Sequence, residues 1–286
     1  MNTMTRDLTA SVRAEILRLG RWPAFWIVLA TWVLLNLTFA YLFNYLAYTS
    51  GENGAMSDGL PRDVLLGQLM PAAVPEVFTQ GMSMFGGALV LILGALAVGS
   101  GYGWGTWKTV FTQGPSRAAA VTGLLVTLLA VVFALVLAAF AVDIGIATVI
   151  AASESQPITM PALDDSLVGI ITGTAILGMW TAAGAFIGAI ARGPALAVGL
   201  GLVWVLVVEN LLRGVAGIFG PIEAVTNLMP GTAAGSAAGA MRTVAGPANP
   251  GVLDILTRGE SFALLAIYVL AFAGGTIWLM TRRDLT

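Results

Sequence analysis

Long apolar runs separated by short polar segments dominate this chain. Six of them approach or exceed the roughly 20 residues that a helix needs to cross about 30 Å of hydrocarbon. They occupy residues 25–47, 78–100, 119–142, 167–191, 195–212 and 261–281. The runs are apolar all round and lack the alternation of strands in a membrane barrel. The pattern predicts an all-α integral membrane protein with six transmembrane helices, formed as a single domain by residues 1–286.

Composition narrows the chemistry that the chain can perform. Hydrophobic residues make up 58% of the 286 positions, only 10% are charged, and cysteine and histidine are absent. The chain therefore has no thiolate, no imidazole base and no metal site of the usual zinc or haem kind. It also lacks a phosphate-binding Gly-x-x-x-x-Gly-Lys-Ser/Thr run and basic arms for nucleic acid. We expect a protein that is not an enzyme and that binds no metal.

The positions of the cations predict the orientation. With the N-terminus in the cytoplasm, nine cations fall inside and four fall outside, which satisfies the positive-inside rule and returns the C-terminus to the cytoplasm. The inside group is Arg6, Arg13, Arg18, Arg21, Lys108, Arg117, Arg192, Arg282 and Arg283, and the outside group is Arg62, Arg213, Arg242 and Arg258.

Residues 1–24 precede the first span and carry four arginines. If residues 7–20 form a helix, Leu8, Val12, Ile16 and Leu19 make an apolar stripe opposite the arginines, although Glu15 interrupts it. That arrangement is typical of an elbow helix lying in the membrane interface. The alternative is a basic tail that only sets the orientation.

Residues 99–121 separate the second and third runs with aromatic, hydroxyl and cationic side chains. Trp104, Trp107 and Phe111 recur at helical spacing and predict a short amphipathic helix at the cytoplasmic face. Gly114-Pro115-Ser116 should end that helix and cap a new one that begins near Arg117.

The same segment contains Gly103-Trp104-Gly105-Thr106 and Thr112-Gln113-Gly114-Pro115-Ser116-Arg117. It resembles the first cytoplasmic loop of permease subunits in the type-2 family of ATP-binding cassette (ABC) exporters. In that family the loop is a coupling helix that docks on a separate ATPase. The resemblance implies that residues 99–118 are the coupling loop, with the contacts made by Trp104, Thr106, Trp107, Lys108, Phe111, Gln113 and Arg117.

The resemblance also implies the assembly and the activity. A homodimer of permease subunits in the bacterial cytoplasmic membrane would work with two ABC ATP-binding subunits, which would hold the ATP and Mg²⁺, so this chain would bind no cofactor directly. It would export a lipophilic or amphipathic substrate such as a drug, an antimicrobial peptide or a lipid. The alternative is a secondary transporter or channel without an ATPase partner.

Residues 213–260 form an outer segment whose first part, 214–229, is too apolar for a solvated loop and too short to cross. A re-entrant gate, as the resemblance implies, and a packed extracellular cap are both compatible with it. Just before it, Glu209, Asn210 and Arg213 are polar residues at the outer end of the fifth run. Glu209 and Arg213 can pair structurally one turn apart, or they can contribute to the substrate path or a dimer contact.

Two further patterns have a structural and a functional interpretation. Asp143 follows the third run and is expected to mark its outer interface. Glycines four residues apart, at 169 and 173 and again at 184 and 188, indicate close helix packing, either inside the chain or in a dimer seam.

Overall fold

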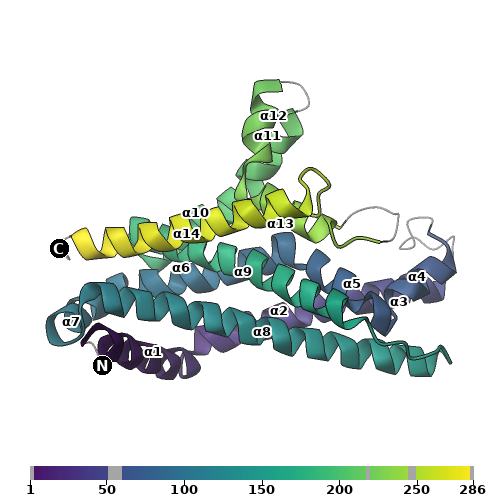
Figure 1. Cartoon of the computed structure of the whole chain (residues 1–286), viewed down its shortest axis with the longest axis horizontal. Helices are drawn as coiled ribbons and strands as arrows, with labels where there is room; N and C mark the ends of the chain where they lie inside the picture. Colours follow the sequence, from purple (N-terminus) through teal and green to yellow (C-terminus); the bar gives the residue numbers. More distant parts are fainter. Residues whose placement is uncertain (1–2, 51–59, 217–219, 244–248, 284–286) are drawn as a thin grey trace.

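The protein is described by a computed structural model that covers residues 3–50, 60–216, 220–243 and 249–283. Within those ranges the regular structure is entirely helical, and most helices lie along one long axis (Figure 1). This agrees with an all-α membrane protein, since a helix satisfies its own backbone hydrogen bonds in hydrocarbon.

Five continuous helical segments are long and apolar enough to cross a membrane. They are the 28-residue run α2–η1–α3, the helices α8 and α9, the run α10–η4–α11, and α14. Their bounds are α2 Pro23–Asn36, η1 Leu37–Leu42, α3 Phe43–Ser50, α8 Arg117–Ser153, α9 Leu163–Ala191, α10 Pro194–Val203, η4 Trp204–Val208, α11 Glu209–Ala216 and α14 Arg258–Arg282. The five overlap five of the six predicted runs.

The second predicted run, 78–100, is built differently. It begins in α5 (Val74–Gln80), passes through the π-helical turn η3 (Met82–Gly86) and continues as the 17-residue helix α6 (Gly87–Gly103). After α6 the chain bends by 77° into α7 (Thr106–Gln113), and the pair is apolar enough to count together as one broken span. By length and composition, the described residues therefore contain five helical segments able to span a membrane, or six with this pair.

Helices α6 and α9 make the closest packing in the core, because both carry glycine at their contact. A side chain at Gly94 would collide with the carbonyl of Thr181, and one at Gly184 would collide with the carbonyl of Leu91. Gly188 lies against Ala95 in the same way. These glycines let two backbones approach inside one chain, so of the two interpretations above the structure supports intramolecular packing.

Helix α1 (Thr3–Gly20) includes the predicted helix at 7–20 and packs along α8. Gly123 of α8 accommodates Ser11, and Leu19 is buried in the core. Arg18 pairs with Glu15 at 2.7 Å and donates to the backbone carbonyl of Ala97 on α6. Burial raises the pKa of Glu15, and neighbouring Arg18 opposes that shift. Helix α1 is thus fixed to the ends of α6 and α8.

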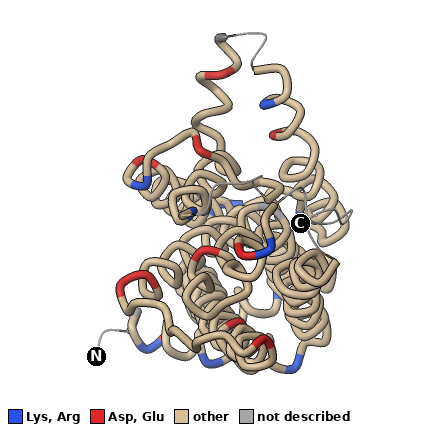
Figure 2. The backbone as a smooth tube through the Cα atoms, turned by 90° about the vertical axis from the view of Figure 1, so that its right-hand side faces the viewer, with Lys and Arg blue, Asp and Glu red and all other residues tan. Residues whose placement is uncertain are grey.

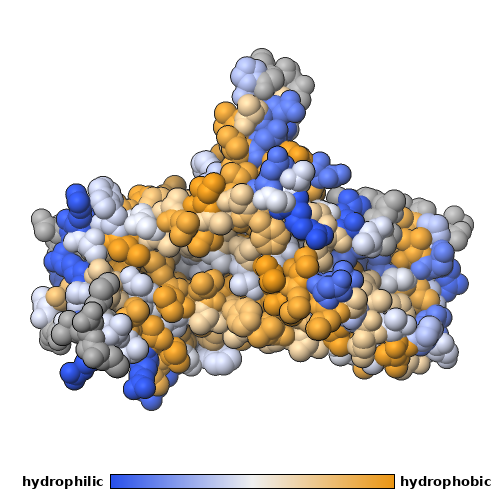
Figure 3. Space-filling view, viewed as in Figure 1, coloured by the Kyte–Doolittle hydropathy of each residue, from blue (hydrophilic) through white to orange (hydrophobic). Residues whose placement is uncertain are grey.

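Different helices and loops form the two ends of the molecule. The N-terminus, α7 and the C-terminus lie at one end, and α3, α4 (Arg62–Gln68) and the loop after α8 lie at the other (Figure 1). Hydrophilic residues cover both ends, and the surface between them is largely apolar (Figure 3). Such a belt is what a membrane protein presents to lipid.

The region after the fifth run departs from the bundle. Helices α11 and α12 (Gly220–Asn227) project together as a hairpin across the direction of the long helices (Figures 1 and 2). The next helix, α13 (Pro230–Gly239), returns to the body beside α14. The predicted outer segment therefore contains a projecting part and a packed part.

One sequence expectation is wrong in position. Asp143 was expected at the outer end of the third span, but α8 continues to Ser153, and Asp143 is fully buried within it. The apolar residues on both sides of Asp143 keep the helix regular, and its carboxylate faces neighbouring helices instead of water.

Candidate functional site

The candidate coupling loop begins with a backbone turn that only glycine adopts readily. Gly105 has φ of 68°, in the left-handed region, and this allows the chain to leave α6 and enter α7 at a sharp angle. At the other end, the Ser116 hydroxyl accepts a hydrogen bond from the Ala119 N–H and caps α8. The predicted helix and cap are both confirmed.

Trp107 fastens α7 to α6. Its indole is only 3% exposed, and its Nε1–H donates to the backbone carbonyl of Val98 at 2.9 Å. Gly101 makes room for the ring, because a side chain there would collide with the indole. The ring also stacks on Phe111, with centroids 5.4 Å apart. Trp107 is therefore an internal anchor.

Arg117 connects the same loop to the C-terminal end of α14. Its guanidinium lies over the Phe111 ring, 5.4 Å from the centroid, and Nη1 donates to the carbonyls of Thr281 and Arg283. Thr281 lies in the last turn of α14 and Arg283 is its C-cap residue, and unpaired acceptors at a helix C-terminus favour a cation. The loop, the start of α8 and the end of α14 thus form one connected unit.

Other residues form the outward face of the loop. Trp104 is 71% exposed, and Lys108, Thr109 and Thr112 are also exposed. Thr106 is half-buried, and the side chain of Gln113 lies outside the described residues. The seven predicted contact residues therefore divide into an exposed group, Trp104 and Lys108, and an anchoring group that contains Trp107, Phe111 and Arg117.

Glu209 is the second candidate site, and its carboxylate is buried at the base of the hairpin. Only 1% of it is exposed. Oε1 accepts a hydrogen bond from the Trp204 indole at 2.7 Å, and Oε2 lies 3.9 Å from Arg213 Nη1. The predicted pairing of Glu209 with Arg213 is present, at a distance near the upper limit for an ion pair.

The Glu209 carboxylate also meets the first turn of α13. It accepts from the backbone of Gly231, and a side chain at Gly231 would collide with Oε2. The N-terminal turn of a helix offers unpaired N–H groups and partial positive charge, so a carboxylate is favourable there. Glu209 therefore joins the fifth span to the outer segment.

Arg213 completes this connection. Its Nη2 donates to Asn210 Oδ1 at 2.9 Å, and Nη1 reaches Thr232 Oγ1 at 3.5 Å. The Asn210 amide nitrogen in turn donates to the carbonyls of Val205 and Leu206, which lie within the π-helical stretch η4. The three polar residues predicted as one group do lie together.

Sequence reasoning missed two hydrogen-bonding side chains on α5. Glu76 lies just before the second predicted run, 78–100, and it is buried and accepts hydrogen bonds from the N–H and hydroxyl of Thr243. Gln80, one turn later, accepts from the Asn249 amide at 2.7 Å. A spacing of four between Glu76 and Gln80 was the signal available, since it places both on one helix face.

A second missed cluster lies at the end of the bundle opposite α7. Tyr45 and Tyr48 of α3 donate to the two carboxylate oxygens of Glu154, at 2.7 and 2.9 Å. These two hydrogen bonds hold the pKa of Glu154 below its usual value of 4.5. The cluster ties the first span to the end of α8.

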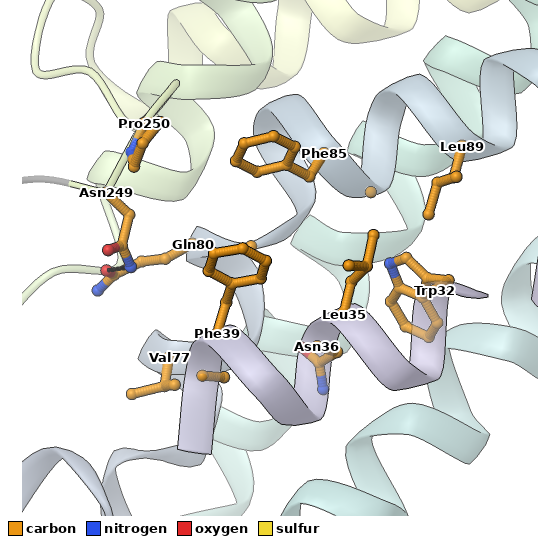
Figure 4. A pocket seen from close by; sticks show the side chains of 13 residues that line it. Trp32, Leu35, Asn36, Phe39, Val77, Gln80, Phe85, Leu89, Asn249 and Pro250 are labelled. Atoms are coloured by element: carbon orange, nitrogen blue, oxygen red, sulfur yellow. Dashed lines mark hydrogen bonds between the residues drawn. The ribbon is translucent and has the colours of Figure 1, made fainter. Parts of the chain in front are cut away.

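A cavity of about 200 Å³ opens between the first span and the α5–η3–α6 segment (Figure 4). Trp32, Phe39 and Phe85 supply aromatic walls, while Asn36, Gln80 and Asn249 supply polar groups. The hydropathy of the sequence does not predict this cavity. Each of its two walls contains a π-helical stretch, η1 in the first span and η3 before α6, and these stretches change the local packing.

Comparison with protein-family models and with curated proteins finds no match to this chain.

Proposed function

We propose that this chain is the permease subunit of an ATP-driven ABC exporter, with a homodimer of such subunits served by two separate ATPases. The observation that carries the proposal is α7: a short helix after a sharp bend, held from behind by Trp107 and presenting Trp104 and Lys108. An exposed tryptophan is a residue type that is enriched among the hot spots of protein interfaces.

The anchoring side of α7 supports a coupling role. Trp107 joins the loop to α6, and Arg117, at the start of α8, joins it to α14. A displacement of α7 would therefore move α6, α8 and α14 together. An alternating-access transporter needs such a rigid connection between its ATPases and its helices. The end that carries α7 would then face the cytoplasm, with α1 as the interfacial elbow.

The projecting hairpin supports the homodimer. Apolar side chains are exposed on it, among them Leu211, Val225 and Leu228, and charged Glu223 lies on the same projection. A charged group facing lipid is costly, so a hairpin with this mixture favours a protein neighbour. A second copy would cover it and would place the outer segments of the two subunits together, where a re-entrant gate could form.

The proposal is tested by purifying the tagged chain from its native membrane and measuring ATP hydrolysis in the eluate. The Trp104→Ala/Lys108→Ala double variant should insert to the same level but lose most of the co-eluting activity. Val126→Ala, a change on the exposed face of α8, is the control and should keep it. An active transporter that elutes without any ATPase subunit would refute the proposal.

A secondary transporter is the second candidate, and buried Asp143 is the observation that favours it. A carboxylate inside a span is a typical proton or cation carrier in that class. Transport in sealed vesicles separates the two: an exporter needs ATP, whereas a secondary transporter follows an imposed ion gradient without it.

A further inference from the structure

Asp143 is a buried acid without a cation partner. It is 0% exposed, its Oδ1 accepts a 2.7 Å hydrogen bond from the Asn36 amide, and its Oδ2 has no hydrogen-bond partner. Among the described residues no lysine or arginine pairs with it. Such a carboxylate is costly in a membrane protein unless something positive compensates for it.

A buried hydroxyl near it also lacks a partner. The Tyr41 hydroxyl makes no hydrogen bond, and Tyr41 lies within range of the Asp143 charge. Buried polar atoms are normally satisfied, so the open Asp143 oxygen and the Tyr41 hydroxyl mark a polar place that the described residues leave unsatisfied.

Asn36 connects that region to the aromatic cavity. It lies on the cavity wall, and its Nδ2 points away from the cavity toward Asp143 (Figure 4). The carbonyl oxygen of the same amide is therefore left on the cavity side, about 3.8 Å from where a side chain at Gly81 would begin. A ligand in the cavity would meet an acceptor oxygen polarised by a carboxylate behind it.

The cavity walls suit a positive charge. Phe39 and Phe85 are nearly parallel, with centroids 6.0 Å apart, and Trp32 forms a further wall. Aromatic faces attract cations within about 6 Å of the ring centroid, and tryptophan does so most strongly. At the outer side, Gln80 and Asn249 are hydrogen-bonded to each other and hold the segment at Pro250 over the cavity.

We propose that this cavity binds a lipophilic organic cation, a quaternary ammonium or protonated amine with an apolar substituent. The cationic group lies between the aromatic faces and the Asn36 carbonyl, and Asp143 compensates its charge from behind. A neutral molecule of equal shape gains only the apolar contacts, because the Coulomb attraction is strong in a low-dielectric interior. The proposal names a substrate class and rests on the proposed function only for its transport.

The test uses the purified full chain, without an ATPase, in nanodiscs of zwitterionic phosphatidylcholine. Equilibrium dialysis measures binding of radiolabelled benzyltrimethylammonium, and neopentylbenzene, its uncharged isostere, is the competitor. We expect the wild type to bind the cation at least about tenfold more tightly than the isostere. Equal binding of the two, or no binding of the cation, would overturn the proposal.

Three variants locate the effect. Asp143→Asn should weaken cation binding about tenfold and leave competition by neopentylbenzene unchanged, since it removes charge and keeps shape. Asp165→Asn removes an exposed carboxylate at the start of α9 and should change nothing. Phe39→Leu, at a half-exposed wall position, should also reduce the cation preference, and it decides the question if Asp143→Asn does not fold. Wild-type cation preference in Phe39→Leu, or in a folded Asp143→Asn, would refute the site.

Failure of the ligand proposal can be distinguished from failure of the proposed function. A chain that binds the cation but purifies without an ATPase would refute only the exporter assignment. A chain that purifies with an active ATPase but has no cation preference would refute only the ligand class.

Discussion

The indole of Trp107 is hydrogen-bonded to the backbone carbonyl of Val98, nine residues earlier, across the 77° bend between α6 and α7. This single contact fixes the angle of the loop helix, because the bond joins its inner face to the span before it. Trp104, on the other side of the bend, makes no comparable contact and is 71% exposed.

The two tryptophans are therefore expected to behave differently on substitution. Trp107→Ala should lower thermal stability, with a loss of about 3 kcal/mol from the buried ring and its hydrogen bond. Trp104→Ala should leave the melting temperature unchanged and reduce association with the ATPase. Thermal unfolding and co-purification of both variants check this, and equal destabilisation by the two would contradict the assigned roles.

Glu209 and Arg213 are expected to be coupled in a double-mutant cycle. The losses of unfolding free energy in the two single alanine variants should add up to more than the loss in the double variant. Removing one partner leaves a poorly solvated charge, at a cost of about 3 kcal/mol. Glu209→Ala should lower the free energy of unfolding more than Arg213→Ala, since Glu209 also accepts hydrogen bonds from Trp204 and Gly231. Unfolding measurements on the four proteins of the cycle provide the test, and strictly additive losses would argue against pairing.

The α6–α9 seam predicts a sharp contrast between two glycines. Gly184→Ala should destabilise the fold by at least about 2 kcal/mol, because the new methyl group would collide with the Leu91 carbonyl. Gly199→Ala, on α10, meets open space and should be neutral or slightly stabilising. Thermal unfolding of both proteins measures the difference, and a stable Gly184→Ala variant would disprove the close approach.

Glu154 predicts a pH dependence of stability at the end of the bundle opposite α7. Hydrogen bonds from Tyr45 and Tyr48 lower its pKa below 4.5, so the ionised group stabilises the folded state at higher pH. That contribution should disappear as the pH falls from 4.5 through the lowered value. The Tyr45→Phe/Tyr48→Phe double variant should lose less stability over this window than the wild type. Melting temperatures measured across the window check it, and identical acid profiles would contradict the assignment.

The proposed orientation is tested with single cysteines in this cysteine-free chain. Cysteine at Ser155, in the exposed loop after α8, should react with an impermeant thiol reagent added outside intact cells. Cysteine at Thr109, on the exposed face of α7, should react only after the cells are opened. The reverse labelling pattern would invert the topology.

The sequence by itself determined the fold class, because runs of about 20 apolar residues have one stable solution in hydrocarbon. It also determined the local features of the loop: Gly105 for the bend, spacing for the helix, and Ser116 for the next cap. Each of these depends on residues close together in the chain. The pairing of Glu209 with Arg213 was predictable for the same reason, since one helical turn separates them.

Tertiary structure decided which face each side chain meets. Trp107 and Trp104 have the same chemistry in the sequence, and only the packing of α7 against α6 buries one and exposes the other. Asp143 appeared to end a span until Asn36, 107 positions away, was found beside it. The aromatic cavity likewise needs three separate segments to be brought together. Contacts of this kind join residues with no sequence relationship, so hydropathy and spacing carry no signal for them.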